Sequence, residues 1–107
     1  MTKQSETRRR MPPVHPGAML REDALPALDL SVKAAAARLG ISRQTLHRIL
    51  AETAPITPEM AVRIGKLCGN GPQLWLAMQQ AYDLFHAEEK LAGEVAAIKT
   101  MHAKKAA

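Results

Sequence analysis

The sequence predicts an all-α protein built around a helix-turn-helix, and three observations support that fold class. Residues 32–50 read as two short helices separated by a turn that a glycine marks. In the segments after this motif, apolar residues recur at the spacing of one helix face. Hydrophobic residues make up 47% of the chain, yet only three residues are aromatic, which is typical of an aliphatic core of packed helices.

The length and charge of the chain limit both its organisation and its partners. With 107 residues it can form one hydrophobic core but not two. The net charge of +5 and the isoelectric point near 9.8 indicate a polyanionic partner, for which DNA, RNA and a membrane surface are all candidates. Residues 1–66 hold eleven basic and six acidic side chains, whereas residues 67–107 hold four of each. The whole excess therefore accompanies the helix-turn-helix and the N-terminal tail.

The single cysteine and the N-terminus indicate a cellular compartment. Cys68 stands alone, so an internal disulfide and a cysteine-rich zinc site are both excluded. No apolar stretch is long enough to span a membrane, and the basic start leads into Pro12 and Pro13 rather than into an apolar signal core. We therefore expect a soluble cytoplasmic protein that does not bind a membrane.

The first segments are a basic tail and a short helix. Residues 1–13 are polar, basic and rich in proline at their end, which predicts a flexible, disordered tail. The three arginines at residues 8–10 either remain solvated or reach along DNA phosphates or into a minor groove. The next apolar residues can share one side of a first helix: Met19, Leu20 and Leu25. Pro26 is expected to end that helix or to form the turn beyond it.

The first helix of the motif has the residue types that close packing requires. Ser31 is placed as its N-cap. Ala36 falls where the two helices approach most closely and where a larger side chain would force them apart. Gly40 ends the helix, where a positive φ costs glycine almost nothing. The apolar contacts that lock the two helices are expected from Leu39, Ile41, Leu46 and Ile49.

The second helix of the motif has one apolar and one polar face. We expect Ser42 to cap it and the helix to run from residue 43 to about residue 51. The polar face and its flanks comprise Arg43, Gln44, Thr45, His47, Arg48 and Ala51. An arginine fork matches guanine O6 and N7, and a glutamine amide matches adenine N6 and N7. Residues 31–51 contain no acidic side chain, which favours a DNA-reading face over a merely solvated surface of a helical hairpin.

Two further helices are predicted after the motif. Thr57 as N-cap, Pro58 at the first helical position and Glu59 in the first turn define the start of the first one. The second covers residues 72–88 and carries all three aromatic residues: Trp75, Tyr82 and Phe85. A core role is the default for this stripe. Because so small a domain rarely buries three aromatic side chains entirely, part of this helix is expected to complete a dimer.

The C-terminal residues are rich in alanine, lysine and glutamate. Three apolar residues recur there at helical spacing: Leu91, Val95 and Ile98. We read this segment as a frayed helix that orders on a partner. The predicted organisation is thus a tail of residues 1–13, a DNA-binding and dimerisation domain of residues 14–88, and an extension of residues 89–107.

The sequence contains no group of residues with the spacing of a known catalytic or metal-binding site. The four histidines lie in different segments, and no two have the i, i+4 spacing of a helical metal pair: His15, His47, His86 and His102. The sequence has no glycine-rich phosphate loop and no nucleophile elbow. Cys68 beside a histidine can in principle act as a nucleophile, but a lone cysteine on an apolar helix side is far more often core. We predict no enzyme, no metal site and no cofactor.

Three blocks of the sequence together resemble the HigA-type antitoxins, also called the VapI family. These belong to the Xre/Cro-like, or lambda-repressor-like, helix-turn-helix proteins. The blocks are HPGAMLRED, LGISRQTLHRIL and ITPEMAVRIGKLCGNGPQLWLAMQQAYDL, and with the residues between them they cover about residues 14–84. The helix-turn-helix is shared by very many regulators, whereas the two flanking blocks narrow the resemblance to this family.

The resemblance implies a five-helix domain, a homodimer on a palindromic operator in double-stranded DNA, and neutralisation of a HigB-like toxin that degrades mRNA. The residues predicted to contact DNA are Ser31, Lys33, Arg38, Ser42, Arg43, Gln44, Thr45, His47 and Arg48. Among them Arg43, Gln44 and Arg48 are expected to read bases, with Thr45 and His47 in support. Phosphates are expected to be held by Ser31, Lys33 and Arg38 or by the arginine tail. The residues predicted to complete the core and the dimer surface are Trp75, Leu76, Gln79 and Tyr82. Many relatives have a glutamine that braces a phosphate where this chain has Val32, and Lys33 can supply that contact as a point charge.

The sequence leaves two classes of function open. One is a dimeric repressor that docks two recognition helices in successive major grooves. The other is a protein inhibitor that covers a toxic ribonuclease and uses DNA binding for feedback. The resemblance unites both roles in the antitoxin of a type II toxin–antitoxin module. The alternative is a stand-alone Xre-family repressor without a toxin partner.

Overall fold

The computed structural model describes residues 11–104, and within them the chain forms helices and no strand. The first helical segment is continuous through α2 (Pro16–Met19), η1 (Leu20–Ala24) and α3 (Leu25–Ala27). It is followed by α4 (Val32–Leu39), α5 (Arg43–Leu50), α6 (Pro58–Cys68), α7 (Pro72–Lys90) and the short α8 (Ala92–Ala96). The predicted all-α class is confirmed. Most of the predicted basic tail, including the arginines at residues 8–10, lies outside the described residues.

The first helical segment ends at Ala27, one residue after Pro26, so Pro26 lies in its last turn, in agreement with the first of the two expected positions. Proline has no N–H to donate, and its ring crowds the carbonyl four residues earlier in a regular α-helix. Here the segment before it widens into a π-helix, in which the Leu25 N–H donates to the Leu20 carbonyl. This wider turn lets the helix continue to Ala27. Asp29, with a φ of 55°, then turns the chain toward α4.

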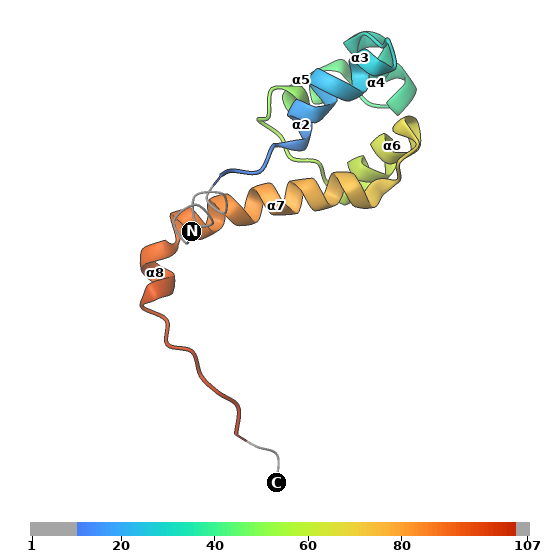
Figure 1. Cartoon of the computed structure of the whole chain (residues 1–107). Helices are drawn as coiled ribbons and strands as arrows, with labels where there is room; N and C mark the ends of the chain where they lie inside the picture. The colour runs from blue at the N-terminus through green and yellow to red at the C-terminus, as the bar shows by residue number, and fades with distance from the viewer. Residues whose placement is uncertain (1–10, 105–107) are drawn as a thin grey trace, which may run out of the picture.

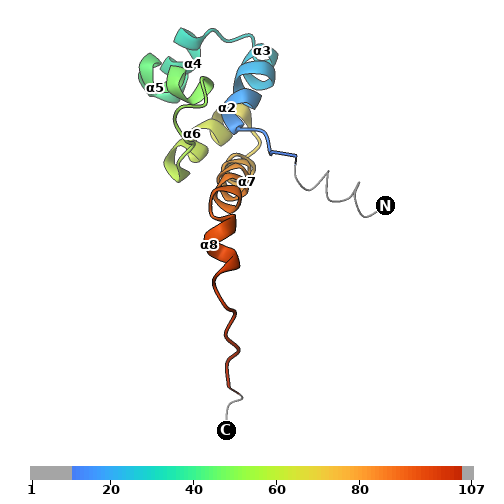
Figure 2. The ribbon, with the colours of Figure 1, turned by 90° about the vertical axis from the view of Figure 1, so that its left-hand side faces the viewer.

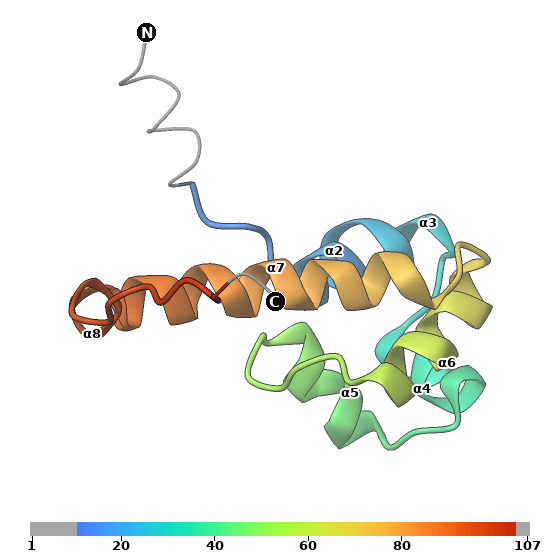
Figure 3. The same cartoon turned by 90° about the horizontal axis from the view of Figure 1, so that it is seen from below.

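The helices divide into a small domain and a long projecting helix. Figures 1 and 2 show α2 to α6 gathered beside the N-terminal half of α7. Figure 3 shows the C-terminal half of α7 and α8 extending beyond that domain. The α6 and α7 helices are joined by a tight glycine-containing turn and pack against each other. None of the helices in the described part of the chain is long and apolar enough to cross a membrane.

The core takes one stripe of side chains from each helix of the domain. Its largest fully buried members are Trp75, Leu20, Leu46, Ile49, Ile56 and Ile64, together with Pro16. Each large aliphatic side chain removed from water stabilises the fold by about 1.5–3 kcal/mol. Gly17 permits the closest approach in this core, because a Cβ there would overlap the main-chain carbonyl of Ile49. The first helical segment thus lies directly against the backbone of α5.

Candidate DNA-binding surface

The start of α5 is formed by a local hydrogen-bonded cap, as the sequence predicts. The Ser42 hydroxyl accepts from the Thr45 main-chain N–H at 3.0 Å and donates to the Thr45 hydroxyl at 2.8 Å. Gly40, at the end of α4, has a φ of 73°, in the left-handed region that glycine tolerates. The cap and the glycine together set where α5 begins and in which direction it leaves the turn.

The two faces of α5 separate as the sequence predicts. Leu46, Ile49 and Leu50 are buried against the rest of the domain. The side chains predicted to read bases are exposed: Arg43, Gln44 and Arg48. Of the two supporting residues, His47 is exposed and Thr45 is half-buried. This outward face offers guanidinium forks and an amide without a neighbouring carboxylate on the same helix. Chemically it can donate to guanine edges and form paired bonds with adenine in a major groove.

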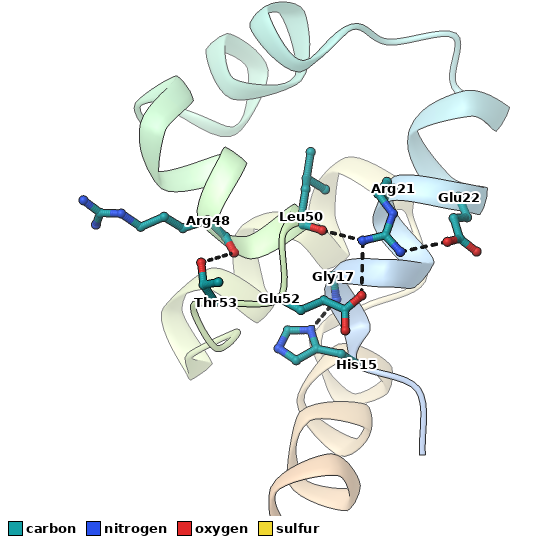
Figure 4. A network of polar contacts seen from close by, with 8 residues as sticks. All are labelled: His15, Gly17, Arg21, Glu22, Arg48, Leu50, Glu52 and Thr53. Carbon is teal, nitrogen blue, oxygen red and sulfur yellow. Dashed lines mark hydrogen bonds and ion pairs between the residues drawn. The ribbon is translucent and has the colours of Figure 1, made fainter. Parts of the chain in front are cut away.

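The C-terminal end of α5 is held by side chains from other segments. Arg21 donates to the Leu50 carbonyl at 2.6 Å and to the Glu52 carboxylate at 3.2 Å. The Thr53 hydroxyl donates to the Arg48 carbonyl at 3.2 Å. Figure 4 shows the Arg48 side chain pointing away from this network. The network therefore anchors the backbone of the helix while the Arg48 guanidinium stays available to a ligand.

The residues predicted to hold phosphates fall at the two ends of α4. Ser31 caps the start of the helix by accepting from the Ala34 N–H at 3.1 Å, and Lys33 is exposed in the first turn. Arg38 lies near the other end, about 10 Å along the helix axis from Ser31. It lines a shallow groove with Arg63 and Lys66 of α6. The structure thus separates Arg38 from Ser31 and Lys33 and places it in a second basic cluster.

Arg63 is a residue whose role the sequence does not reveal. Its guanidinium donates to the Leu39 carbonyl at 2.8 Å, so α6 caps the C-terminal end of α4. The partners are 24 residues apart, and no local pattern links them. Only the packing of α6 against α4 brings them together. Arg63 therefore stabilises the angle of the first helix of the motif.

Of the four residues predicted for the core and the dimer surface, two are fully buried in the core and two are half-buried at its edge. Trp75 is 1% exposed and donates from its indole N–H to the Asn70 side-chain oxygen at 2.8 Å. Gln79 is 4% exposed, accepts from the Ile56 N–H at 2.8 Å and donates to the Asp83 carboxylate at 2.9 Å. Both side chains therefore have the core role that was predicted for them, because the partners that satisfy their polar groups lie in the same chain. Their part in a dimer surface stays a prediction.

The other two residues of that set, Leu76 and Tyr82, are half-buried against the domain. Tyr82 packs edge-on against the imidazole of His15, with ring centres 4.8 Å apart. The opposite side of α7 carries apolar side chains that nothing in the described chain covers. We call this set the outer stripe; it consists of Leu74, Ala77, Ala81 and Leu84. Leu74 is 44% and Leu84 60% exposed, so the free apolar surface of α7 lies here.

His15 joins the first helical segment to this arrangement. Its Nδ1 accepts from the Gly17 N–H at 2.9 Å, which requires an unprotonated Nδ1. Burial lowers the pKa of His15, while the carboxylates of Glu52 and Asp83 partly oppose that shift. The neutral imidazole is thus the form that fits the folded protein.

The cysteine and the histidines form no catalytic or metal-binding cluster in the described part of the chain, although His15 and His86 both pack against Tyr82. Burial raises the pKa of the Cys68 thiol, so the thiol form is favoured over the nucleophilic thiolate. Within residues 11–104 no group of three histidine, cysteine or acidic side chains is arranged to hold a metal ion. The chemistry that the structure does assemble is hydrogen bonding and positive charge on one helix face.

The fold and this helix face define a class: an Xre-like helix-turn-helix DNA-binding protein. Residues 20–75 match the Helix-turn-helix family. Within this class the chain belongs to the HigA-type antitoxins, or VapI family. It is similar to Virulence-associated protein I of Dichelobacter nodosus, with 42% identity over 74% of this chain and 73% of that protein. It is also similar to Antitoxin HigA-1 of Vibrio cholerae, with 29% identity over 90% of this chain and 89% of that protein.

A solved structure agrees with this assignment. Pseudomonas aeruginosa antitoxin HigA, determined with the higBA promoter, has a TM-score of 0.79 and 31% sequence identity. The match covers 84% of this chain and 99% of that one. The similarity therefore extends over the whole domain and not only over the helix-turn-helix.

Proposed function

We propose that this chain is the antitoxin of a type II toxin–antitoxin module. In this role it binds its own operator as a repressor and neutralises a HigB-like, mRNA-degrading toxin by protein–protein binding in the cytoplasm. The observation that carries the DNA-binding part is the exposed face of α5, where Arg43, Gln44 and Arg48 stand clear of the fold. The related HigA solved with its promoter supports the same reading.

The contacts with DNA divide by chemistry. Arg43, Gln44 and Arg48 read base edges, with Thr45 and His47 in support. Ser31 and Lys33 at the start of α4 hold phosphates, which set the register but carry no sequence information. Arg38 takes part through its basic cluster with Arg63 and Lys66. Ser42 serves the interface indirectly by capping α5.

The homodimer forms through the outer stripe of α7. A palindromic operator presents two half-sites about one helical turn apart, and a symmetric dimer matches them with two recognition helices. Because Trp75 and Gln79 are used within one chain, the surface for the second copy is the exposed apolar side of the same helix. Its leucines flank two alanines, which allow two helix backbones to approach closely.

The DNA-binding part is tested by titrating the promoter fragment upstream of the gene at fixed salt. Gln44→Ala and Arg48→Ala should each cost about 1–3 kcal/mol and relax specificity at one position per half-site. Lys99→Ala is the matched control, because it removes an exposed positive charge from the chain beyond α8. Unchanged binding by both α5 variants would rule out α5 as the reading helix.

The toxin-neutralising part needs a separate experiment. The reading frame next to the gene should encode a short basic protein that arrests growth when expressed alone. Co-expression of this chain should restore growth, and the two proteins should co-purify. If operator binding is intact while rescue and co-purification both fail, the chain is a stand-alone Xre-family repressor.

A further inference from the structure

The outer stripe is the first half of a longer apolar pattern. Leu74, Ala77, Ala81 and Leu84 are separated by three and four residues in alternation. The same alternation continues through Glu88, Leu91, Val95 and Ile98, all of which are exposed. In the sequence this is the heptad spacing of helices that pack along a shared seam. In the structure α7 ends at Lys90, Leu91 has a non-helical φ of -101°, and α8 covers only Ala92–Ala96, so the pattern passes from α7 into a second, short helix. We call residues 88–98 the C-terminal arm.

The composition of this seam favours an antiparallel pair. In a parallel pair each residue faces its own copy, so Glu88 would meet a second Glu88 at a seam position, and like charges there repel. In an antiparallel pair centred between Ala77 and Ala81, Leu74 meets Leu84 of the second copy and Ala77 meets Ala81. Large residues then flank a close crossing of small ones, and the arrangement is self-complementary, as a two-fold dimer requires.

The antiparallel arrangement determines which part of the second copy the C-terminal arm lies against. Figure 1 shows α6 at one end of α7 and α8 at the other. The arm of one copy therefore runs past the start of α7 of the second copy, where α6 turns into α7. An open groove of about 420 Å³ lies at this corner. We call it the corner groove; it is lined by Val62, Gly65, Lys66, Gly69, Gly71 and Pro72.

The corner groove and the arm are complementary in shape and charge. The glycines leave the groove open, and Val62 provides an apolar wall that is 58% exposed. The arm offers Leu91 and Val95 as apolar contacts. The arm carries three carboxylates, Glu88, Glu89 and Glu94, and one lysine, Lys90. The groove carries Lys66, and Arg63 lines the neighbouring groove.

From this complementarity we propose that the C-terminal arm of each copy docks in the corner groove of the other copy. The proposal rests on the dimer described under Proposed function and extends it by an exchanged arm. It gives the exposed apolar residues of α8 a partner within the dimer. It also links dimer formation to the basic cluster around Arg38, because Lys66 belongs to both places.

Charge reversal tests the contact between Glu88 and Lys66. Within one chain these side chains lie far apart, because Glu88 is 16 residues, about 24 Å, beyond the start of α7. In full-length protein without DNA, Glu88→Lys and Lys66→Glu should each raise the dimer dissociation constant roughly tenfold, since each dimer contains the ion pair twice. The double variant should recover to within about twofold of the wild type, and Glu89→Lys, on a neighbouring face, should change little.

Sedimentation equilibrium provides the readout, and its outcomes separate the two proposals. If the single charge reversals have no effect, or if the double variant is as weak as the two changes combined, the arm does not dock in the groove. The dimer then stands provided that Leu84→Glu still breaks it. A wild-type chain that remains monomeric at the highest soluble concentration would overturn both the arm and the dimer.

Disulfide trapping tests the orientation independently in a Cys68→Ser background. With both Leu91→Cys and Val62→Cys, mild oxidation should give a covalently linked dimer. Leu91→Cys alone should remain unlinked, because the antiparallel arrangement keeps the two copies of residue 91 apart. A linked dimer from Leu91→Cys alone would indicate a parallel seam and would overturn the proposal.

Discussion

The helices α5 and α7 both pack one side against the same core, but their free sides have opposite chemistry. On α5 the free side carries Arg43, Gln44 and Arg48. On α7 it carries the outer stripe, whose leucines and alanines are exposed to water. Polar side chains can stay hydrated until DNA replaces the water, whereas an apolar stripe is unfavourable until another apolar surface covers it. This difference is the physical basis of the proposal that α5 meets DNA and α7 meets a second copy of the chain.

The largest expected effect is on the free energy of unfolding. It comes from truncating a leucine on the core side of α5, and a leucine truncated on the free side of α7 provides the comparison. Leu46 is fully buried, so Leu46→Ala should lower the free energy of unfolding by about 2–5 kcal/mol. Leu84→Ala should change it by less than about 0.5 kcal/mol in the monomer while weakening the dimer. Urea unfolding at dilute concentration measures the first quantity, and sedimentation measures the second. Equal loss of monomer stability in both variants would mean that the outer stripe belongs to the folding core.

A smaller change in unfolding free energy should distinguish the buried side of α7, which carries Gln79, from its exposed side, which carries Gln80. Gln79→Leu leaves the buried Ile56 N–H without its acceptor, which should cost about 1–3 kcal/mol of unfolding free energy. The neighbouring Gln80 is exposed, so Gln80→Leu serves as the control and should leave stability unchanged. If Gln79→Leu instead weakened the dimer at constant monomer stability, Gln79 would belong to the dimer surface after all.

The smallest effect should be a pH dependence that comes from His15. Because burial depresses its folded pKa below the ordinary value of 6.5, the unfolded chain binds a proton more readily than the folded chain. The contribution to stability is therefore present above about pH 6.5 and is lost as the pH falls toward the folded pKa. His15→Asn should flatten the fall in unfolding free energy between neutral and mildly acidic pH. His102→Asn, at an exposed position, should leave the fall intact.

The sequence was informative wherever one short segment contains both partners of an interaction. The caps Ser31, Ser42 and Thr57 each bond within three residues, so their residue types and positions predict them directly. The turn at Gly40 follows from the backbone freedom of glycine. The alternation of buried and exposed side chains on α5 follows from the helical repeat. These local rules predicted the recognition helix and its exposed side chains.

The sequence was uninformative where the partners come from distant segments. Nothing near Gln79 indicates that its amide will satisfy the Ile56 N–H, and nothing near Arg63 indicates that it will cap the Leu39 carbonyl. The spacing of apolar and aromatic residues along α7 predicted an amphipathic helix. It did not predict which apolar side chains would stay exposed once the other helices pack against α7. The structure buries Trp75 in the core and leaves Leu74 and Leu84 exposed on the other side of the same helix.

The sequence alone therefore determined the helix-turn-helix, its caps and the polar face of α5, because these depend on hydrogen bonds and periodicity within a few residues. Only the tertiary structure decided which side of α7 remains free, because that depends on how α6 and the first helical segment pack against it. A helix with apolar residues on more than one side has several ways to be buried. The packing of the other helices selects one of them and leaves the outer stripe to a partner.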